Sequence, residues 1–378
     1  MALTLADVLR EHWPGYARAH RSALAAAHYR AVRCVLACRS PAMGGRLYRC
    51  KACRKTHFAY HSCNHRNCPQ CGALDQQIWS ARQEARLLPV PYFMVTFTLA
   101  SELRSLCLAQ PKTLYRLMLK ESAAALSDVI ASKTKGARAG FTSVLHTWGR
   151  QMQHHPHVHL IVPAIALGAE GKHLLHPPKD TFLVHYRPLA ERFRSRLQRA
   201  LKDQHPDIDT QLTGDQRRAL APATQWNVQL QPVGRGQAAL RYLARYVQRS
   251  AFHPKRLLGY DPTGHILLRW TSSDTRRSAV MRLHPHEFIR RWLLHVLPKG
   301  FTRLRHYGFL SSAATPTRLK IRLLLGELGE PLPKLPQLDP FPCPQCGGVL
   351  HFVREIPRLR AARGPPLTTL APHHQKSP

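Results

Sequence analysis

Acidic residues are scarce in this 378-residue chain, with 21 Asp and Glu against 56 Lys and Arg. The resulting formal net charge of +35 is spread along the whole sequence and is not confined to one tail. A basic surface of that extent favours a polyanionic partner, with nucleic acid ahead of a membrane surface.

Long apolar runs are also missing. The longest, around residues 160–167, is interrupted by Pro163 and is far shorter than the ~20 residues that a membrane-spanning helix needs. The first residues, MALTLADVLREHW, contain Asp7 and Glu11 and lack the apolar segment of a secretory signal. We therefore expect a cytoplasmic protein with no membrane partner, whose ten cysteines serve as metal ligands and not as disulfides.

The order of helical and strand patterns predicts an α+β fold. Residues 1–40 and 73–88 have helical patterns, and a polar stretch rich in Cys and His lies between them. Alternating apolar residues then predict strands, with helices between them. The strands are expected at 92–100, 140–148, 154–164, 225–230 and 265–271, and the helices at roughly 101–130, 187–203 and 237–250.

The composition divides the chain into three expected regions. Residues 1–90 would form a zinc-binding, DNA-recognition domain and residues 91–312 a catalytic domain. Residues 313–378 would form a C-terminal region that ends in a Pro- and Arg-rich tail, of which the last ~20 residues are expected to be disordered.

Two CxxC pairs dominate the N-terminal region. Cys50/Cys53 and Cys68/Cys71 are separated by fourteen residues, and two such pairs supply the four sulfur ligands of a closed tetrahedral zinc site. We therefore predict one structural zinc ion bound by these four cysteines. Other residues between the pairs could replace one of them or help to bind a second ion, namely His57, His61, Cys63 and His65. The basic residues of the stretch suit either phosphate contacts or a solvated surface.

A third CxxC pair, Cys343/Cys346, repeats the CPQC sequence and has no second pair close to it in the sequence. It is either half of a second zinc site, to which His351 could contribute, or a relic of one. Cys34, Cys38 and Cys107 lie in helical patterns and are expected to be packed thiols.

The stretch HHPHVHLIVP at residues 154–163 places histidines at alternate positions. In a β-strand, His155, His157 and His159 would share one face, while the apolar residues Val158, Leu160 and Val162 would face a core. This pattern indicates a candidate metal site. A second HPH sequence, at residues 284–286, runs into a helical pattern and provides an internal control.

A helical pattern at residues 237–250 carries two tyrosines four residues apart. Leu240, Leu243 and Val247 cluster on one side of this helix, and Tyr242 and Tyr246 lie together away from them. Arg245 and Arg249 flank the tyrosines. The tyrosines are either ordinary surface residues or nucleophiles, in which case the two arginines would bind the phosphate that they attack.

Taken together, these elements resemble the two-tyrosine HUH transposases of the insertion sequence 91 type. The resemblance extends from about residue 8 to residue 312 and rests on the order of the motifs. They are CRSPAMGGRLYRCKAC, YHSCNHRNCPQC, HHPHVHLIVP, LRYLARYVQR and FIRRWLLHVLPKGFTRLRHYG. The resemblance implies a central antiparallel sheet, with the histidines on an inner strand and the tyrosine helix packed nearby.

The resemblance also implies roles for single residues. The metal-binding histidine pair falls on His157 and His159, and the nucleophiles fall on Tyr242 and Tyr246. The third ligand of the catalytic ion, Mg²⁺ or Mn²⁺, is not fixed by a motif, and His155 and Gln153 are candidates by geometry. The zinc ligands are the four cysteines of the two N-terminal CxxC pairs.

The implied function is DNA transposition in a bacterial cytoplasm, in association with the nucleoid. The enzyme would nick and rejoin single-stranded DNA at insertion-sequence ends through 5′-phosphotyrosine intermediates. Three alternatives stay open: a replication initiator or relaxase with the same chemistry, a non-catalytic zinc DNA-binding protein, and a metal-dependent hydrolase.

Overall fold

The computed structural model describes residues 3–358, except for 178, 180–182, 249–250, 273–274, 276 and 337–341. The side chains of residues 245–248 are also outside the described part. Arg249 and the tail expected to be disordered therefore lie outside the described residues.

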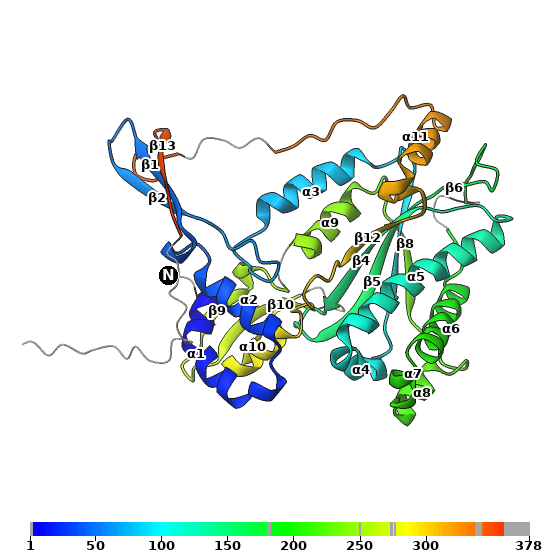
Figure 1. Cartoon of the computed structure of the whole chain (residues 1–378), viewed down its shortest axis with the longest axis horizontal. Helices are drawn as coiled ribbons and strands as arrows, with labels where there is room; N and C mark the ends of the chain where they lie inside the picture. Colours follow the sequence, from blue (N-terminus) through cyan, green and yellow to red (C-terminus); the bar gives the residue numbers. More distant parts are fainter. Residues whose placement is uncertain are drawn as a thin grey trace, which may run out of the picture.

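The centre of the molecule is a five-stranded antiparallel sheet (Figure 1). The chain enters it through β3 (Tyr92–Thr98), continues in β4 (Phe141–Trp148) and β5 (His154–Pro163), and returns with β8 (Val228–Pro232) and β12 (Leu304–Tyr307). The order across the sheet is β12-β4-β5-β3-β8, so that β5 is the middle strand. The α+β fold with a central antiparallel sheet is thus confirmed.

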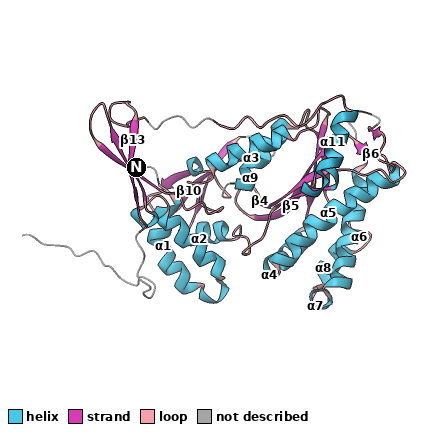
Figure 2. Cartoon of the chain, turned by 45° about the horizontal axis from the view of Figure 1, so that its top comes forward, coloured by secondary structure: helices cyan, strands magenta, loops and turns pink. Residues whose placement is uncertain are grey.

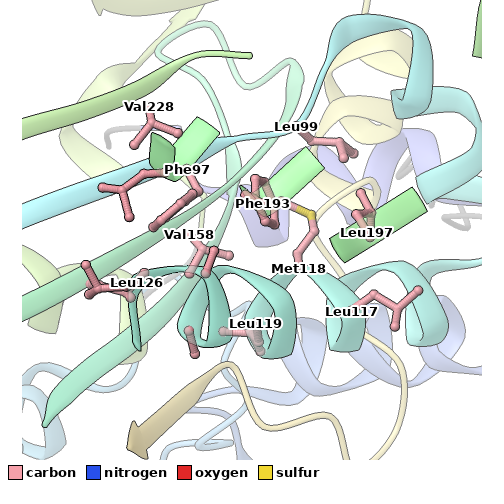
Figure 3. Packing of buried hydrophobic residues seen from close by; sticks show 14 of the residues in the cluster. Phe97, Leu99, Leu117, Met118, Leu119, Leu126, Val158, Phe193, Leu197 and Val228 are labelled. Atoms are coloured by element: carbon pink, nitrogen blue, oxygen red, sulfur yellow. The ribbon is translucent and has the colours of Figure 1, made fainter. Parts of the chain in front are cut away.

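Two long helices, α5 (Pro111–Lys133) and α6 (Tyr186–Gln204), cover one face of the sheet (Figures 1 and 2). The shorter α4 (Arg104–Ala109), α7 (Pro206–Thr210) and α8 (Gly214–Leu220) lie at their ends. Figure 3 shows Phe97 and Val158 of the sheet packed against Phe193, Met118 and Leu119 of these helices. Val158, Leu160 and Val162 all belong to this core, as the alternation in β5 predicts.

The opposite face of the sheet is covered by α3 (Ala73–Ala85), α9 (Gln237–Gln248) and α11 (Thr315–Leu324). Leu240 and Leu243 of α9 are buried there against Val144 and Ile161 of the sheet. Arg241 on the outer side of α9 forms an ion pair with Glu84 of α3, with 3.0 Å between Nε and Oε1. Helix α9 therefore lies over the strand face that carries the odd-numbered residues of β5.

A second body combines residues from both halves of the chain. Helices α1 (Leu5–Ala19) and α2 (Ala26–Ala37) share a core with α10 (Pro285–Leu293) and with a separate three-stranded sheet. That sheet has the order β11-β10-β9 and contains β9 (Leu257–Tyr260), β10 (Ile266–Thr271) and β11 (Ser278–Leu283). The strand expected at 265–271 is therefore present, but it lies outside the central sheet.

A small ribbon joins the two ends of the described chain. β1 (Gly45–Cys50) and β2 (Thr56–Tyr60) form a hairpin, and β13 (Leu350–Ile356) pairs with the free edge of β1. In Figure 1 the red β13 lies beside the blue β1 and β2, and the described residues 326–336 lead from α11 towards this ribbon. A final two-stranded sheet pairs β6 (Ala166–Leu167) with β7 (Leu174–Leu175).

The three expected regions are linked across their boundaries. The core shared by α1, α2 and α10 joins the first region to the second, and the β1–β13 pairing joins the first to the third. Among the described residues, no helix is both long and apolar enough to cross a membrane.

Candidate metal and tyrosine site

Three histidines meet on the face of the central sheet that α9 covers. In the antiparallel pairing of β4 and β5, His146 is the direct partner of His157, and Val144 is the partner of His159. Directly opposed residues of an antiparallel pair project from the same face, so the register brings His146, His157 and His159 together. Their ligand nitrogens all lie within 4.8 Å of one another.

The rings of this histidine triad are in close contact. The Nδ1 atom of His146 is 2.7 Å from Nε2 of His157. The ring centroids of His157 and His159 are 4.8 Å apart, and those of His146 and His159 are 5.9 Å apart. No more than 8% of the surface of any of the three is exposed. The triad is therefore a buried group of nitrogen donors, converging on one point.

Hydrogen bonds fix which nitrogens are available to an ion. His157 donates from Nδ1 to the backbone carbonyl of His155 at 2.7 Å, which leaves the lone pair on Nε2. Nδ1 of His159 is 2.9 Å from the hydroxyl oxygen of Thr96, its direct partner on β3. Metal-binding histidines are commonly oriented by such a bond from the other ring nitrogen.

Burial keeps the triad neutral. It lowers the pKa of His157 to about 4, and it lowers the pKa of His146 and His159 well below the usual value. The nearby histidines lower these pKa values further, because each disfavours a second positive charge. Neutral imidazoles are the form that binds metal ions, and the sites are therefore ready to bind at neutral pH.

The donor set fits a divalent ion. Nε2 of His159 is fully buried and has no hydrogen-bond partner among the described residues. A buried polar atom without a partner is costly, and a coordinated ion would satisfy it. Three imidazole nitrogens leave further coordination positions open for a phosphate oxygen or water, as in catalytic metal sites.

The loop between the two histidine strands is fixed by the second body of the fold. Arg291 of α10 donates to the carbonyl of Gln151 at 2.9 Å, and Nε2 of His295 donates to that of Met152 at 3.0 Å. Met152 is fully buried and has a φ of 60°, a conformation that non-glycine residues rarely adopt. These contacts hold the ends of β4 and β5, and with them the register of the triad.

Tyr242 is the described tyrosine of α9 that lies at the triad. Its ring centroid is 6.1 Å from that of His159, with the two planes at 82°. The residue is 38% exposed, whereas Leu240 and Leu243 on the other side of the helix are buried. Tyr242 is on the side of α9 that was predicted to face away from the packed residues. Its phenol therefore lies between the histidines and solvent.

The side chains of the other residues predicted on this helix are outside the described part. Tyr246 lies within α9, one turn after Tyr242, and Arg245 lies between them, but the side chains of both are outside the described part. Arg249 lies outside the described residues altogether. Their predicted roles, nucleophile for Tyr246 and phosphate binding for the arginines, stay predictions.

The third histidine of the triad, His146, was not among the predicted ligands. His155 lies outside the group and accepts a hydrogen bond from Arg104 at its Nδ1, at 3.0 Å. Gln153 is at the turn before β5, where its Oε1 accepts from the backbone of Gln151. One sequence signal was present: Val144, His146 and Trp148 alternate in the strand predicted at 140–148, and this alternation puts His146 on one face of that strand.

The cysteines form two groups of four. Cys38, Cys63, Cys68 and Cys71 lie together, with 3.2 Å between the sulfurs of Cys38 and Cys71 and 3.6 Å between those of Cys63 and Cys71. The second group consists of Cys50, Cys53, Cys343 and Cys346. Four thiolates converging in this way fit the donor set of a structural zinc ion.

This grouping corrects the predicted ligand set, which combined Cys50 and Cys53 with Cys68 and Cys71. The first pair lies at the turn of the β1–β2 hairpin, and the second group lies at its base. Strands of five and six residues separate turn from base by roughly 17–20 Å, too far for a shared ion. Cys38, expected to be a packed thiol, and Cys63 complete the group at the base.

Comparisons with known proteins agree on one family. Residues 8–99 match the family described as "Transposase zinc-binding domain", and residues 140–317 match that described as "Putative transposase". The protein "Putative transposase y4qJ" of Sinorhizobium fredii is 34% identical over an alignment of 339 residues, which covers 85% of this chain and 84% of that protein. The "Transposase for insertion sequence element IS801" of Pseudomonas savastanoi pv. phaseolicola is 28% identical over an alignment of 354 residues, which covers 86% of this chain and 83% of that protein. No solved structure matches the chain.

Proposed function

Because the chain belongs to the insertion sequence 91 family of transposases, we propose that it cuts and rejoins single-stranded DNA at the ends of an insertion sequence. Tyr242 and Tyr246 are the proposed nucleophiles, and the histidine triad is the proposed site of a Mg²⁺ or Mn²⁺ ion. The observation that carries the proposal is the position of Tyr242, whose ring lies against His159 of the triad.

The proposed reaction is an in-line displacement at phosphorus. The phenol oxygen of a tyrosine forms a bond to the scissile phosphorus, and the bond from phosphorus to the 3′-oxygen breaks. The phenol proton passes to solvent, and the departing 3′-oxygen takes up a proton. The products are a free 3′-hydroxyl and a 5′-phosphotyrosine, which keeps the phosphodiester bond energy, so that the reverse step rejoins DNA without ATP.

The chain must help the phenol, because tyrosine has a pKa of about 10 and is a poor nucleophile at neutral pH. A divalent ion bound to the triad would supply a Lewis acid next to the phosphate. The three histidines would hold their nitrogens in fixed positions, neutral and shielded from water. Arg245 and Arg249 are proposed to bind the phosphate, since a guanidinium can donate two parallel hydrogen bonds to two phosphate oxygens.

Two tyrosines on one helix suit a reaction with two strand transfers. One tyrosine would hold the first cut end while the other cuts or accepts the next end. The net charge of +35 supports long contact with a DNA strand throughout this cycle, independent of its sequence.

Two other classes of function would require only some of these residues. A zinc protein that only binds DNA would need the cysteines and the charge, but neither the triad nor Tyr242. A metal-dependent hydrolase would need the triad but would form no covalent bond to DNA. A replication initiator would share the whole chemistry, and the family matches favour the transposase over it.

The deciding experiment uses labelled single-stranded DNA that carries an insertion-sequence end. The full-length protein is incubated with this DNA and Mn²⁺ and analysed on a denaturing gel, on which a covalent adduct migrates with the protein. We expect an adduct with the unchanged protein and none with the Tyr242→Phe, Tyr246→Phe double variant, while DNA binding is retained. Metal-dependent cleavage without an adduct would favour the hydrolase, and binding alone would favour the non-catalytic protein.

A further inference from the structure

The geometry points to a zinc site shared between the two ends of the chain, formed by Cys50 and Cys53 with Cys343 and Cys346, which fastens β13 to the N-terminal module. The family matches span residues 8–99 and 140–317, so neither of them includes Cys343 and Cys346. In the sequence Cys53 and Cys343 are 290 residues apart. The fold places them in one group of four thiols.

The distances between the sulfurs suit one ion. Cys50 and Cys346 are 3.5 Å apart at their sulfurs, and Cys53 and Cys343 are 3.7 Å apart. Each of these contacts crosses from one pair to the other. A tetrahedral zinc ion with Zn–S bonds of about 2.3 Å separates its sulfurs by about 3.8 Å, so the four atoms need to move little to bind it.

The backbone on both sides has the form of a metal-binding turn. The residue after each CxxC pair has a left-handed conformation, with a φ of 59° at Arg54 and 74° at Gly347. The same is true of Gly72, which follows Cys71 in the other cysteine group, with a φ of 79°. The three turns thus share one local geometry, although their sequences differ at this position.

The turn around Cys343 is closed by backbone hydrogen bonds, and the space beside Gly348 is too small for a side chain. The backbone N–H of Cys343 donates to the carbonyl of Gly348 at 2.7 Å, and that of Gly347 donates to the carbonyl of Cys343 at 2.8 Å. A Cβ atom on Gly348 would lie 3.3 Å from the sulfur of Cys50 and 3.4 Å from that of Cys346. The glycine therefore lets the backbone approach the sulfur group closely.

Nearby side chains suit the charge of the bound state. Four thiolates and one Zn²⁺ carry a net charge of −2, and the exposed Lys51, Arg54 and Lys55 in the first turn would offset it. His57 on β2 has its Nε2 atom 3.2 Å from the sulfur of Cys343. A hydrogen bond from this N–H to the thiolate would orient the ligand, which makes His57 a positioning residue.

The ribbon needs such a link because it has little apolar core. Phe58 is 60% exposed, Phe352 is 56% exposed and Val353 is 49% exposed. In the segment that leads from α11 to the ribbon, Leu328 and Leu332 are almost completely exposed and add no packing. Small sheets with so little buried surface are marginal on their own, and a structural metal commonly supplies the missing stability.

The test is the zinc content of the full-length protein and of two double variants, measured by native mass spectrometry. One double variant carries Cys343→Ser and Cys346→Ser, and the other carries Cys50→Ser and Cys53→Ser. We expect each double variant to contain one zinc ion fewer than the unchanged protein, because both remove ligands of the same ion. Hydrogen exchange at the backbone of β13 should become at least roughly tenfold faster in both, while that of the central sheet is unchanged. The matched control is Cys34→Ser, a half-buried thiol of α2 that belongs to neither group and should keep every ion.

Two further variants make the result specific. Cys68→Ser, Cys71→Ser should also lose one zinc ion, but with slow exchange retained in β13. Cys346→His, which replaces an exposed thiol by another zinc ligand, should keep the ion, so a loss seen in the double variant cannot be ascribed to misfolding of the segment. An unchanged zinc content in Cys343→Ser, Cys346→Ser would overturn the proposal. These measurements involve no DNA, so they are independent of the proposed strand transfer.

Discussion

The chain contains the sequence His-Pro-His twice, and the two copies fold differently. In both, the rings of the two histidines are similarly spaced, with centroids 5.1 Å apart for His155 and His157 and 5.2 Å apart for His284 and His286. The first copy lies in the middle strand of the central sheet, where His157 joins the triad. The second begins helix α10, where the ring of His284 accepts a hydrogen bond from the backbone N–H of His286 at 3.3 Å.

The difference shows that the partner strand, and not the motif, brings potential metal ligands together. Around the first copy, β4 places His146 directly opposite His157, and β3 places Thr96 directly opposite His159. The second copy belongs to no group of three converging metal ligands in the part of the chain that the structure describes. A histidine pair at a helix start contributes a cap, whereas one in a strand can gain a third ligand from across the ladder.

The largest expected effect is a difference in adduct formation between alanine variants of the two His-Pro-His copies. His157→Ala with His159→Ala removes two of the three proposed ligands and should abolish formation of the covalent DNA adduct in Mn²⁺. His284→Ala with His286→Ala, the matched control, should form the adduct at the normal level once its folding is verified by circular dichroism. Equal loss in both variants would mean that the position of the first copy is irrelevant.

The next effect concerns the ligand that the motif does not contain. His146→Ala should weaken binding of Mn²⁺ by more than roughly 100-fold, because even the outer partners of metal ligands contribute about 10–100-fold. His155→Ala removes a histidine of the motif itself that contacts Arg104 outside the triad, and it should retain most of the affinity. Isothermal titration with Mn²⁺ measures the affinity of both variants. A larger loss of affinity in His155→Ala than in His146→Ala would indicate that His155, and not His146, is the third ligand.

A smaller effect is expected from the orienting hydroxyl. Thr96→Val removes the partner of His159 Nδ1 and should weaken Mn²⁺ binding by about 10–100-fold, with the fold retained. The sheet offers a matched control: Thr142 has the same 2.9 Å contact to Nδ1 of His306, which is not part of the triad. Thr142→Val should leave the metal affinity unchanged. If both variants bind Mn²⁺ like the unchanged protein, Thr96 does not orient the ligand.

The smallest effect tests the second copy as a helix cap. His284→Ala removes the acceptor for the N–H of His286 and should lower the free energy of unfolding by about 1 kcal/mol. His284→Asn, which restores a favoured capping residue, should recover this loss. Urea denaturation measures both changes. Normal stability in the alanine variant would show that the side chain contributes no cap.

The sequence predicted what depends on local periodicity. The alternation in residues 154–163 correctly placed Val158 and Leu160 in the core and His157 with His159 on the opposite face. The helical period of residues 237–248 likewise separated the buried Leu240 and Leu243 from the exposed Tyr242. These assignments need only the geometry of one element.

What the sequence did not predict depends on contacts between distant elements. His146 joins the triad through the register of β4 against β5, which no pattern within β4 specifies. The CxxC spacing identified which cysteines act as pairs, but not which pairs meet. That depends on the hairpin that separates Cys50 from Cys68, and on the pairing of β13 with β1, which brings in Cys343 from the turn before β13.

The most direct test of the proposed chemistry identifies the amino acid that carries the DNA. Trypsin cleaves after Arg241 and Arg245, so it releases Tyr242 and Tyr246 in separate peptides, residues 242–245 and 246–249. The covalent adduct is treated with nuclease and trypsin, and the remaining nucleotide is located by mass spectrometry. We predict that it is found on one or both of these two peptides. A nucleotide found on any other peptide would contradict the assignment of the tyrosine helix as the source of the nucleophile.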